Sequence, residues 1–464
     1  MYKIGKWVLQ FSVAPSIIDN KVSFNQLYYN WLSSDNICVC ENNDGMYALF
    51  LPFFSKCELY VKGNIISDNI ECLVADCNVD KDSLKTIIQY GFTCAPKTMY
   101  QEIKRLPIGH YLQINDKNTE YSFNAIRLLG DAYREKSLKE IFGQCISDTK
   151  CVGNTEIGFS GGLDSTLIAE FLDSNSKINL VNIYVEQGRN ENKYHDIYLK
   201  NKCKKINYIR MTSSDALSAF ERHLSEHEIF GMSIVLKYEF LFNNARERSV
   251  NSLLLGDGAD DLFLNSANTD EFLDAKKRKL YPLFNQWYDK ISNLDILHYP
   301  YHSENFYIWW VYNFVIMSNA NYRFEQRIAK RNNIVLSSPY LKPAMIDYCI
   351  EHQEQIFAEP TKNRLKQIAA GRIDNKIINR KKMGFTSDVD IWFKKGQVFN
   401  EKLRELLSND KALFSCEVNK GLVMEKLKQF ECKNEYLNTN SGGNGLSNGL
   451  FAVMTVLQWA INNL

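Results

Sequence analysis

Apolar and polar positions alternate in short runs over the first 125 residues. The runs "ICVCE" (37–41), "GMYALFLPFF" (45–54), "CELYVKG" (57–63) and "GHYLQIN" (109–115) are separated by Asn, Asp and Gly, which indicates β-strands joined by turns. One helical stretch, "DKDSLKTIIQYG" (80–91), interrupts them. Residues 1–125 are therefore predicted to form an α+β domain with antiparallel sheets.

The pattern changes near residue 155, where buried strands begin to alternate with helices. Strands are expected at 155–159, 178–185, 206–211 and 251–256, and helices at 163–174, 193–205 and 213–229. Such alternation predicts right-handed βαβ units and a parallel sheet, and so an α/β domain over residues 126–464. From about residue 270 the pattern is mainly helical, apart from a Gly/Asn/Ser loop expected at 438–449.

Composition narrows the class of protein only modestly. The 464 residues are 45% hydrophobic and 23% charged, with a net charge of +1, so neither nucleic acid nor an anionic membrane is expected as a partner. The longest apolar segments, 308–317 and 450–464, are too short to cross a bilayer, which takes about 20 residues. We expect core helices there, no signal peptide and a cytoplasmic location, with the twelve cysteines reduced.

Two histidines could suggest a metal site. His223 and His227 are four residues apart, but the glutamate between them is not placed as in H-E-x-x-H. The sequence therefore favours a solvated helix face over a metal site at this position.

The stretch "EIGFSGGLDSTLIAEF" (156–171) places small residues between a strand and a helix. Glycines at a helix N-terminus let several backbone N–H groups approach one anion, and the hydroxyls of Ser160 and Ser165 add donors. Asp164 would repel phosphate unless a cation such as Mg²⁺ lay between them. A tight turn without a ligand is the alternative, since the stretch is neither a Walker loop nor a Rossmann fingerprint.

A second stretch, "LLLGDGADDLF" (253–263), repeats the arrangement. In a parallel sheet both loops lie at the carboxyl ends of their strands, where open α/β sheets bind ligands. Asp164 and Asp260 are therefore predicted to face one Mg²⁺ on the phosphates of a nucleotide. A solvated acidic turn would explain the charge, but not the apolar strand before it.

These motifs resemble a known family. "SGGLDS" is similar to the pyrophosphate-binding loop of PP-loop ATP pyrophosphatases, and "GDGADDLF" resembles the G-[ED]-G-[AS]-D-E-[LV]-F of asparagine synthetase relatives. "NRKKMGF" (379–385) resembles that family's R-x-K-x-G-F, and "TKNRLKQIA" (361–369) its K-x-x-L-[RK] helix. Residues 90–114 are similar to the end of its amidotransferase domain. The resemblance implies a degenerate Ntn-type amidotransferase-like domain at 1–125, and a PP-loop, HUP-like synthetase domain with a helical extension at 126–464.

Family members adenylate a carboxylate with ATP and Mg²⁺, release pyrophosphate, and let an amine attack the acyl-adenylate. By motif match, the residues that bind ATP would be Phe159, Ser160, Gly161, Gly162, Asp164, Ser165 and Gly256. Asp164 and Asp260 would hold Mg²⁺. Lys382 would be the catalytic lysine with Arg380 beside it, and Asp257 would position or deprotonate the amine.

Three departures separate this chain from asparagine synthetases. Tyr2 stands where glutamine-using members have a cysteine nucleophile, so the N-terminal domain is expected to lack glutaminase activity. "VLSSPYLKP" (335–343) replaces E-x-R-x-P-F-L-D, and "NENKYHDIYLKN" (190–201) lacks the usual acidic pair. Both changes argue against an aspartate substrate.

Loss of the glutaminase beside intact synthetase motifs is similar to β-lactam synthetases, carbapenam synthetases and lasso-peptide cyclases, in which the substrate supplies its own amine. The expected partner is thus a peptide or small molecule that bears a carboxylate and an amine, together with a possible biosynthetic protease. An ammonia-dependent amidating enzyme and an inactive scaffold remain alternatives. The aromatic segment 299–314 could line a peptide-sized pocket, although a helical core is the stronger interpretation.

Overall fold

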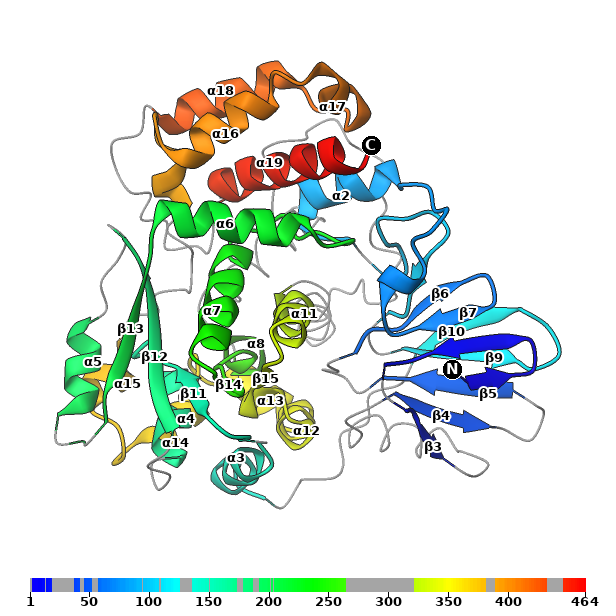
Figure 1. Cartoon of the computed structure of the whole chain (residues 1–464). Coiled ribbons are helices and arrows are strands. Elements are labelled where there is room, and N and C mark those ends of the chain that lie inside the picture. The colour runs from blue at the N-terminus through cyan, green and yellow to red at the C-terminus, as the bar shows by residue number, and fades with distance from the viewer. Residues whose placement is uncertain are drawn as a thin grey trace.

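The computed structural model shows two N-terminal sheets, a parallel sheet and a helical layer (Figure 1). It describes residues 2–12, 14–18, 37–41, 46–51, 57–93, 95–107, 110–125, 136–149, 151–172, 178–186, 192–200, 202, 204–263, 321–380, 389–431 and 445–464. The aromatic segment 299–314 and the apolar segment 308–317 lie outside these residues.

The N-terminal sheets pack face to face. The first has the order β1-β2-β7-β6-β8 and the second β10-β9-β5-β4-β3. The strands of the first are β1 (Tyr2–Ile4), β2 (Trp7–Gln10), β6 (Tyr60–Lys62), β7 (Ile65–Ser67) and β8 (Lys104–Arg105); those of the second are β3 (Ser16–Ile18), β4 (Cys38–Glu41), β5 (Met46–Phe50), β9 (His110–Asn115) and β10 (Tyr121–Ala125). Four of them, β4, β5, β6 and β9, confirm predicted strands.

One apolar core joins the two sheets. Trp7 and Val61 from the first sheet share it with Val39, Leu49 and Leu112 from the second, as expected when alternate residues of a strand face inward. The prediction of antiparallel sheets was wrong at two pairs, because β2 pairs with β7 and β3 with β4 in parallel. The Ntn-type relationship stays a prediction.

Helix α2 (Lys81–Tyr90) confirms the one helix predicted in this region. Asp80 caps its first turn, and Gly91 ends it at φ 86°, a left-handed conformation that suits glycine. Its apolar side packs beside α19 (Gly445–Asn463) (Figure 1). Leu84 and Ile87 share one core with Phe451 and Leu457 of α19. Residues from the N-terminal region and from the last helix of the chain thus contribute to a common core.

The central sheet is wholly parallel, with the order β13-β12-β11-β14-β15. Its strands are β11 (Thr155–Gly158), β12 (Ile178–Val185), β13 (Ile206–Met211), β14 (Ser252–Leu254) and β15 (Val335–Ser337). The first four confirm the predicted strands. Because the chain runs outward from β11 to β13 and then returns to the other side of β11, the switch point lies between β11 and β14.

Helices cover this sheet and build the C-terminal layer. They are α3 (Leu138–Ser147), α4 (Leu163–Phe171), α5 (Asn192–Leu199), α6 (Ser213–Leu224), α7 (Val235–Glu247), α8 (Ala259–Phe263), α11 (Arg323–Arg331), α12 (Pro343–Glu351), α13 (Gln353–Ala358), α14 (Asn363–Ala369), α15 (Asn375–Ile378), α16 (Val398–Leu406), α17 (Asp410–Ser415), α18 (Lys420–Glu431) and α19, with 3₁₀ turns η1 (Ile70–Cys72), η3 (Pro339–Leu341) and η4 (Val389–Phe393). The predicted helices at 163–174, 193–205 and 213–229 are confirmed as α4, α5 and α6, each ending earlier than expected.

Two details of the helices correct the sequence-based picture. The loop expected at 438–449 is helical from Gly445 onward, where α19 begins, while 438–444 lies outside the described residues. His223 is not on a solvated face: it is fully buried, and Phe230 N–H donates to its Nε2 at 2.7 Å. The core helix expected at 450–464 is confirmed, with Phe451 and Leu457 buried.

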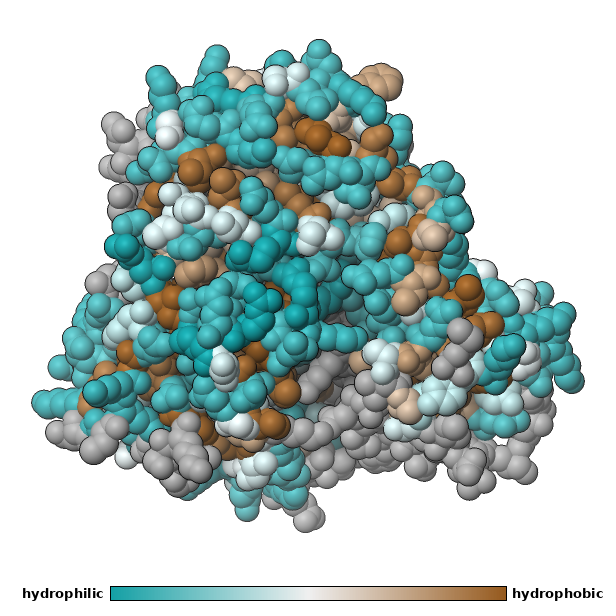
Figure 2. Space-filling view, in the orientation of Figure 1, coloured by the Kyte–Doolittle hydropathy of each residue, from teal (hydrophilic) through white to brown (hydrophobic). Residues whose placement is uncertain are grey.

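Hydrophilic residues prevail on the face of the molecule drawn in Figure 2, with apolar residues scattered among them. Within the described ranges, no helix combines the length and apolarity that a membrane span requires.

Candidate active site

The loop between β11 and α4 is organised by its own hydroxyls. Ser165 Oγ accepts a hydrogen bond from Ser160 N at 3.2 Å and donates to Gly162 O at 3.3 Å. Gly161 has φ +65° and Gly162 is the N-cap of α4, without a side-chain cap. The first turn of α4 therefore presents backbone N–H groups that have no partner within the helix, as an anion-binding turn requires.

Side chains behind this loop fix its backbone. Arg380 Nη1 donates to Gly161 O at 2.9 Å and to Ser160 O at 3.3 Å, and its guanidinium stacks over Tyr194. A Cβ on Gly161 would lie 2.7 Å from His195 Cδ2, so only glycine fits. In this structure Arg380 supports the loop, and a direct catalytic role for it stays a prediction.

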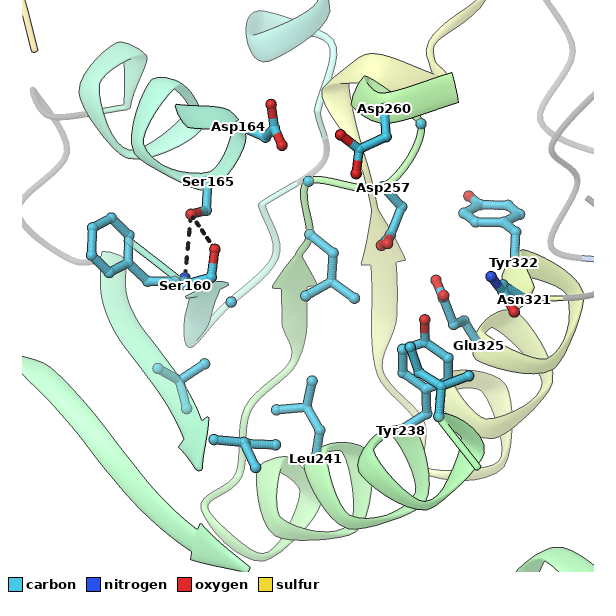
Figure 3. Close-up of a pocket in the computed structure, with 18 of the residues that line it drawn as sticks. Ser160, Asp164, Ser165, Tyr238, Leu241, Asp257, Asp260, Asn321, Tyr322 and Glu325 are labelled. Atoms are coloured by element: carbon cyan, nitrogen blue, oxygen red, sulfur yellow. Dashed lines mark hydrogen bonds between the residues drawn. The ribbon is translucent and has the colours of Figure 1, made fainter. Parts of the chain in front are cut away.

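The loop between β14 and α8 lies against the first one. A Cβ on Gly256 would stand 3.2 Å from Asp164 Cβ, and Gly258 has φ +88°. Ser338 Oγ, which follows β15, donates to Asp257 O at 2.7 Å. These contacts bring the carboxylates of the two loops to facing sides of one cavity (Figure 3).

The carboxylates of Asp164 and Asp260 converge on a single cation. Lys362 Nζ lies 2.6 Å from Asp164 Oδ2 and 2.5 Å from Asp260 Oδ1. Two carboxylates from neighbouring loops beside a phosphate-binding turn are a donor set that suits Mg²⁺, which commonly takes one or two carboxylates and completes its shell with phosphate oxygens and water. The ammonium of Lys362 marks where a cation is stabilised.

The far end of the cavity is acidic and phenolic. Glu325 on α11 is buried and hydrogen-bonded to Tyr238 and Asp257. Burial, and then the charge of Asp257, raises the pKa of Glu325 well above its usual range, as low polarity and a nearby like charge both disfavour an ionised carboxyl. Burial followed by the charges of Asp260 and Asp257 raises the pKa of Asp261 to about 7, against the opposing effect of Lys362.

The cavity joins these two ends and has a volume of about 350 Å³. Its wall between them is largely apolar, with Val181, Ile183, Leu241 and Leu255. Chemically, one end can hold a polyphosphate with its metal ion, while the other can accept a proton from a reacting group. Such an arrangement suits a reaction in which a phosphate-activated group is attacked by a nucleophile that loses a proton.

Comparison with known proteins identifies the family. The profile of asparagine synthase matches residues 148–441, more than half of the chain. This chain belongs to the asparagine synthase family. The family is ATP-dependent and usually uses Mg²⁺, which agrees with the donor set of Asp164 and Asp260, and it supports a ligase-type enzyme in general terms.

This asparagine synthase family member was also compared with curated protein sequences and with solved structures. No curated protein sequence matches it. Among solved structures, it is similar to the U34-tRNA thiolase NcsA from Methanococcus maripaludis with its [4Fe-4S] cluster, at 13% identity, over 53% of this chain and 87% of that one, with a TM-score of 0.21. A likeness at that score carries no argument.

The structure brings most of the predicted site residues of this asparagine synthase family member to one place. Phe159, Ser160, Asp164, Ser165, Gly256, Asp257 and Asp260 line the cavity. Gly161 and Gly162 shape the loop, Arg380 supports it, and Lys382 lies outside the described residues. The roles assigned to these residues in binding and catalysis stay predictions.

Sequence reasoning missed several residues of the site. Lys362 belongs to the helix whose similarity to the family's K-x-x-L-[RK] was noted, but nothing in that motif gave its position between two carboxylates. Glu325, Tyr238 and Tyr322 also line the cavity. They stand on helices α7 and α11 or just before one, without a glycine or an acidic motif to mark them, and only the tertiary fold brings them to Asp257.

Proposed function

We propose that this protein is an ATP-dependent, AMP- and pyrophosphate-forming amide ligase. It adenylates a substrate carboxylate, which an amine then attacks. The observation that carries the proposal is the convergence of Asp164 and Asp260 on one cationic position, in a cavity whose opposite end holds the hydrogen-bonded pair Asp257 and Glu325. The first end fits nucleotide chemistry, and the second fits amine chemistry.

In the first step, a substrate carboxylate oxygen bonds to the α-phosphorus of ATP while the bond from that phosphorus to pyrophosphate breaks. The N–H groups of the loop at 160–162 and the hydroxyl of Ser165 bind phosphate oxygens, and Lys362 supplies positive charge beside them. Mg²⁺ held by Asp164 and Asp260 would neutralise the charge on pyrophosphate as it leaves. Lys382, which the family resemblance makes the catalytic lysine, would add to this stabilisation.

In the second step, an amine nitrogen bonds to the acyl carbon and the bond to AMP breaks. The nitrogen must lose a proton, and we assign its receipt to the hydrogen-bonded pair of Asp257 and Glu325, which lines the cavity at the acidic end. Glu325 is buried beside Tyr238 and Tyr322, and burial raises its pKa, which favours the acceptance of a proton at this end.

The sharper proposal is intramolecular cyclisation, such as formation of a lasso-peptide macrolactam. It rests on the resemblance to glutaminase-lacking relatives and on the altered segment 335–343, whose Ser338 anchors the Asp257 backbone. A peptide that carries both groups would bring its carboxylate to the nucleotide end and its amine within bonding reach of that carboxyl carbon, on the side that faces the acidic end. A protease partner and a cytoplasmic location, where ATP is available, belong to this proposal.

The test uses the purified protein with ATP, Mg²⁺ and each short peptide encoded beside its gene that has a free N-terminal amine and an internal Asp or Glu. Loss of one water from a peptide, with stoichiometric AMP, supports cyclisation. Asparagine formed from aspartate and ammonium would favour the ammonia-dependent alternative. Absence of AMP with every peptide and with aspartate would refute a ligase.

Two variants separate the half-reactions. Glu325→Gln and Asp257→Asn should retain ATP–pyrophosphate exchange with the active substrate and lose amide formation by about 100-fold, within the range of a missing general base. Equal loss of both reactions would contradict the roles assigned to the acidic end.

A further inference from the structure

Helix α11 carries side chains to two different places. Glu325, and Tyr322 just before the helix, line the cavity. Arg323 and Arg327 instead contact Glu58, which precedes β6 in the N-terminal sheets: Arg323 Nε lies 3.2 Å from Glu58 Oε1 and Arg327 Nε 3.1 Å from Oε2. One short helix therefore links the candidate base to the N-terminal domain.

The contact on the N-terminal side is a buried cluster of charges. Glu228 lies 3.0 Å from Arg323 Nη2 and 3.5 Å from Nη1 of Arg105 on β8, whose Nη1 is also 3.6 Å from Glu58. Three guanidinium groups thus share two carboxylates. Arg323 is the first residue of α11, so these ion pairs fix that part of the helix in place.

Burial makes the cluster sensitive to any loss of charge. Glu228 is fully buried and the Glu58 side chain only 15% exposed. Burial raises the pKa of Glu228, while Arg105 and Arg327 lower it. Removal of the Glu58 carboxylate would leave Glu228 as the one carboxylate of the cluster for three guanidinium groups, and buried charge that is not fully compensated is strongly destabilising.

We propose that Glu58 is a positioning residue for the synthetase site: through Arg323 and Arg327 it fixes α11 so that Glu325 faces the cavity. The N-terminal domain then contributes to amide formation without any glutaminase chemistry of its own. The effect on amide formation rests on the proposed function, whereas the effect on α11 does not.

Hydrogen–deuterium exchange of the ligand-free full-length protein tests the structural half. Glu58→Gln should speed amide exchange in 321–331 by about threefold to thirtyfold, as a coupling of ordinary size gives, with exchange in β12 unchanged. Glu58→Asp keeps the charge and should restore protection. Lys330→Met is the matched control, because Lys330 is on the same helix and reaches Asp68 at 4.0 Å but is half exposed. Unchanged exchange in 321–331, or a rise of equal size throughout the protein, would overturn the proposal.

A double-mutant cycle tests the functional half, with the peptide that supports AMP release. Glu58→Gln should lower the rate of amide formation by a similar factor and change its pH profile, while ATP–pyrophosphate exchange stays within about twofold. In a Glu325→Gln background the same change should have no further effect. If the double variant loses activity by the product of the two single fold-losses, Glu58 acts independently of Glu325, and the positioning role is overturned. Altered exchange in 321–331 without AMP release under any condition would contradict the proposed function alone.

Discussion

The ammonium group of Lys362 contacts both carboxylate oxygens of Asp164, at 2.7 and 2.6 Å. Lys362 is the N-cap of α14 and has φ +54°, a left-handed conformation that costs a residue with a side chain about 1 kcal/mol. Its second partner, Asp260, belongs to the other loop. The lysine thus neutralises the two carboxylates that are predicted to bind metal.

Replacing this lysine should make the two carboxylates depend on Mg²⁺ for charge compensation. In Lys362→Met the two carboxylates repel each other, so the metal-free protein should lose about 2 kcal/mol of stability, and Mg²⁺ without nucleotide should restore much of it. Denaturation curves with and without Mg²⁺ give the answer. Lys366→Met, on the same helix, should behave like the wild type. A lack of Mg²⁺ response in Lys362→Met would argue against a metal site at Asp164 and Asp260.

Loss of the Asp164 or the Asp260 carboxylate should affect Mg²⁺-dependent ATP binding, whereas loss of the Asp257 carboxylate should not. Wild-type protein is expected to bind Mg²⁺·ATP more tightly than metal-free ATP, and Asp164→Asn or Asp260→Asn should remove most of that difference, since each removes a charged ligand. Asp257→Asn alters the same loop as the Asp260 variant, but it should keep the preference for Mg²⁺·ATP over metal-free ATP. Calorimetric titration with and without Mg²⁺ measures each case. An equal loss in all three variants would show that general loop damage is responsible.

Two glycine-to-alanine substitutions should change the stability of the protein in opposite directions. Gly161→Ala adds a Cβ at φ +65° and 2.7 Å from His195 Cδ2, so it should cost about 2 kcal/mol and weaken ATP binding. Gly143→Ala, in helix α3 with open space around it, should stabilise the protein by about 0.5–1 kcal/mol. Urea denaturation distinguishes the two. A neutral Gly161→Ala would mean that the loop has another conformation.

His223 should make the stability depend on pH. Burial first, and then the charge of Arg331, lowers its pKa from 6.5 to about 3. The folded chain therefore binds fewer protons than the unfolded chain between these values, and stability is full above about pH 6.5 and falls as the pH drops toward 3. Between pH 7 and 4.5 the loss from this residue should be roughly 2–3 kcal/mol.

His223→Gln keeps an acceptor for the Phe230 N–H and cannot titrate. Its stability should therefore fall less over the same pH range, as measured by urea denaturation at each pH. Parallel pH curves for the two proteins would assign the acid sensitivity to other groups.

The parallel sheet was predictable because local signals agreed with the final fold. Apolar strands such as 178–185 and 206–211 are bounded by polar loops, and their bounds match the structure. The N-terminal strands β1, β2, β3, β7, β8 and β10 were not predicted, since runs of two to five residues give a weak pattern; β6 is as short, but it lies within the longer apolar run 57–63. The start of α19 was also missed, because Gly445 and its polar neighbours indicate a loop unless tertiary packing decides otherwise.

The candidate site was predictable only where glycine and aspartate share a motif. Gly161, Asp164 and Asp260 could be recognised in the sequence, because a close backbone approach needs glycine and a Mg²⁺ site needs carboxylates. Glu325 could not be recognised in this way, because its segment "YRFEQRIAKR" has the charge pattern of a surface helix. Its burial is due to long-range contacts, which no local pattern records.

The packing of α2 against α19 has a consequence for any shorter version of this chain that lacks the N-terminal region. Helix α2 belongs to the N-terminal region but completes the core of the C-terminal layer, where Leu84 and Ile87 meet Phe451 and Leu457. A gene shortened from its 5′ end would therefore encode a protein with an exposed apolar seam rather than a smaller enzyme. The N-terminal region therefore has a structural role in addition to any chemistry of its own.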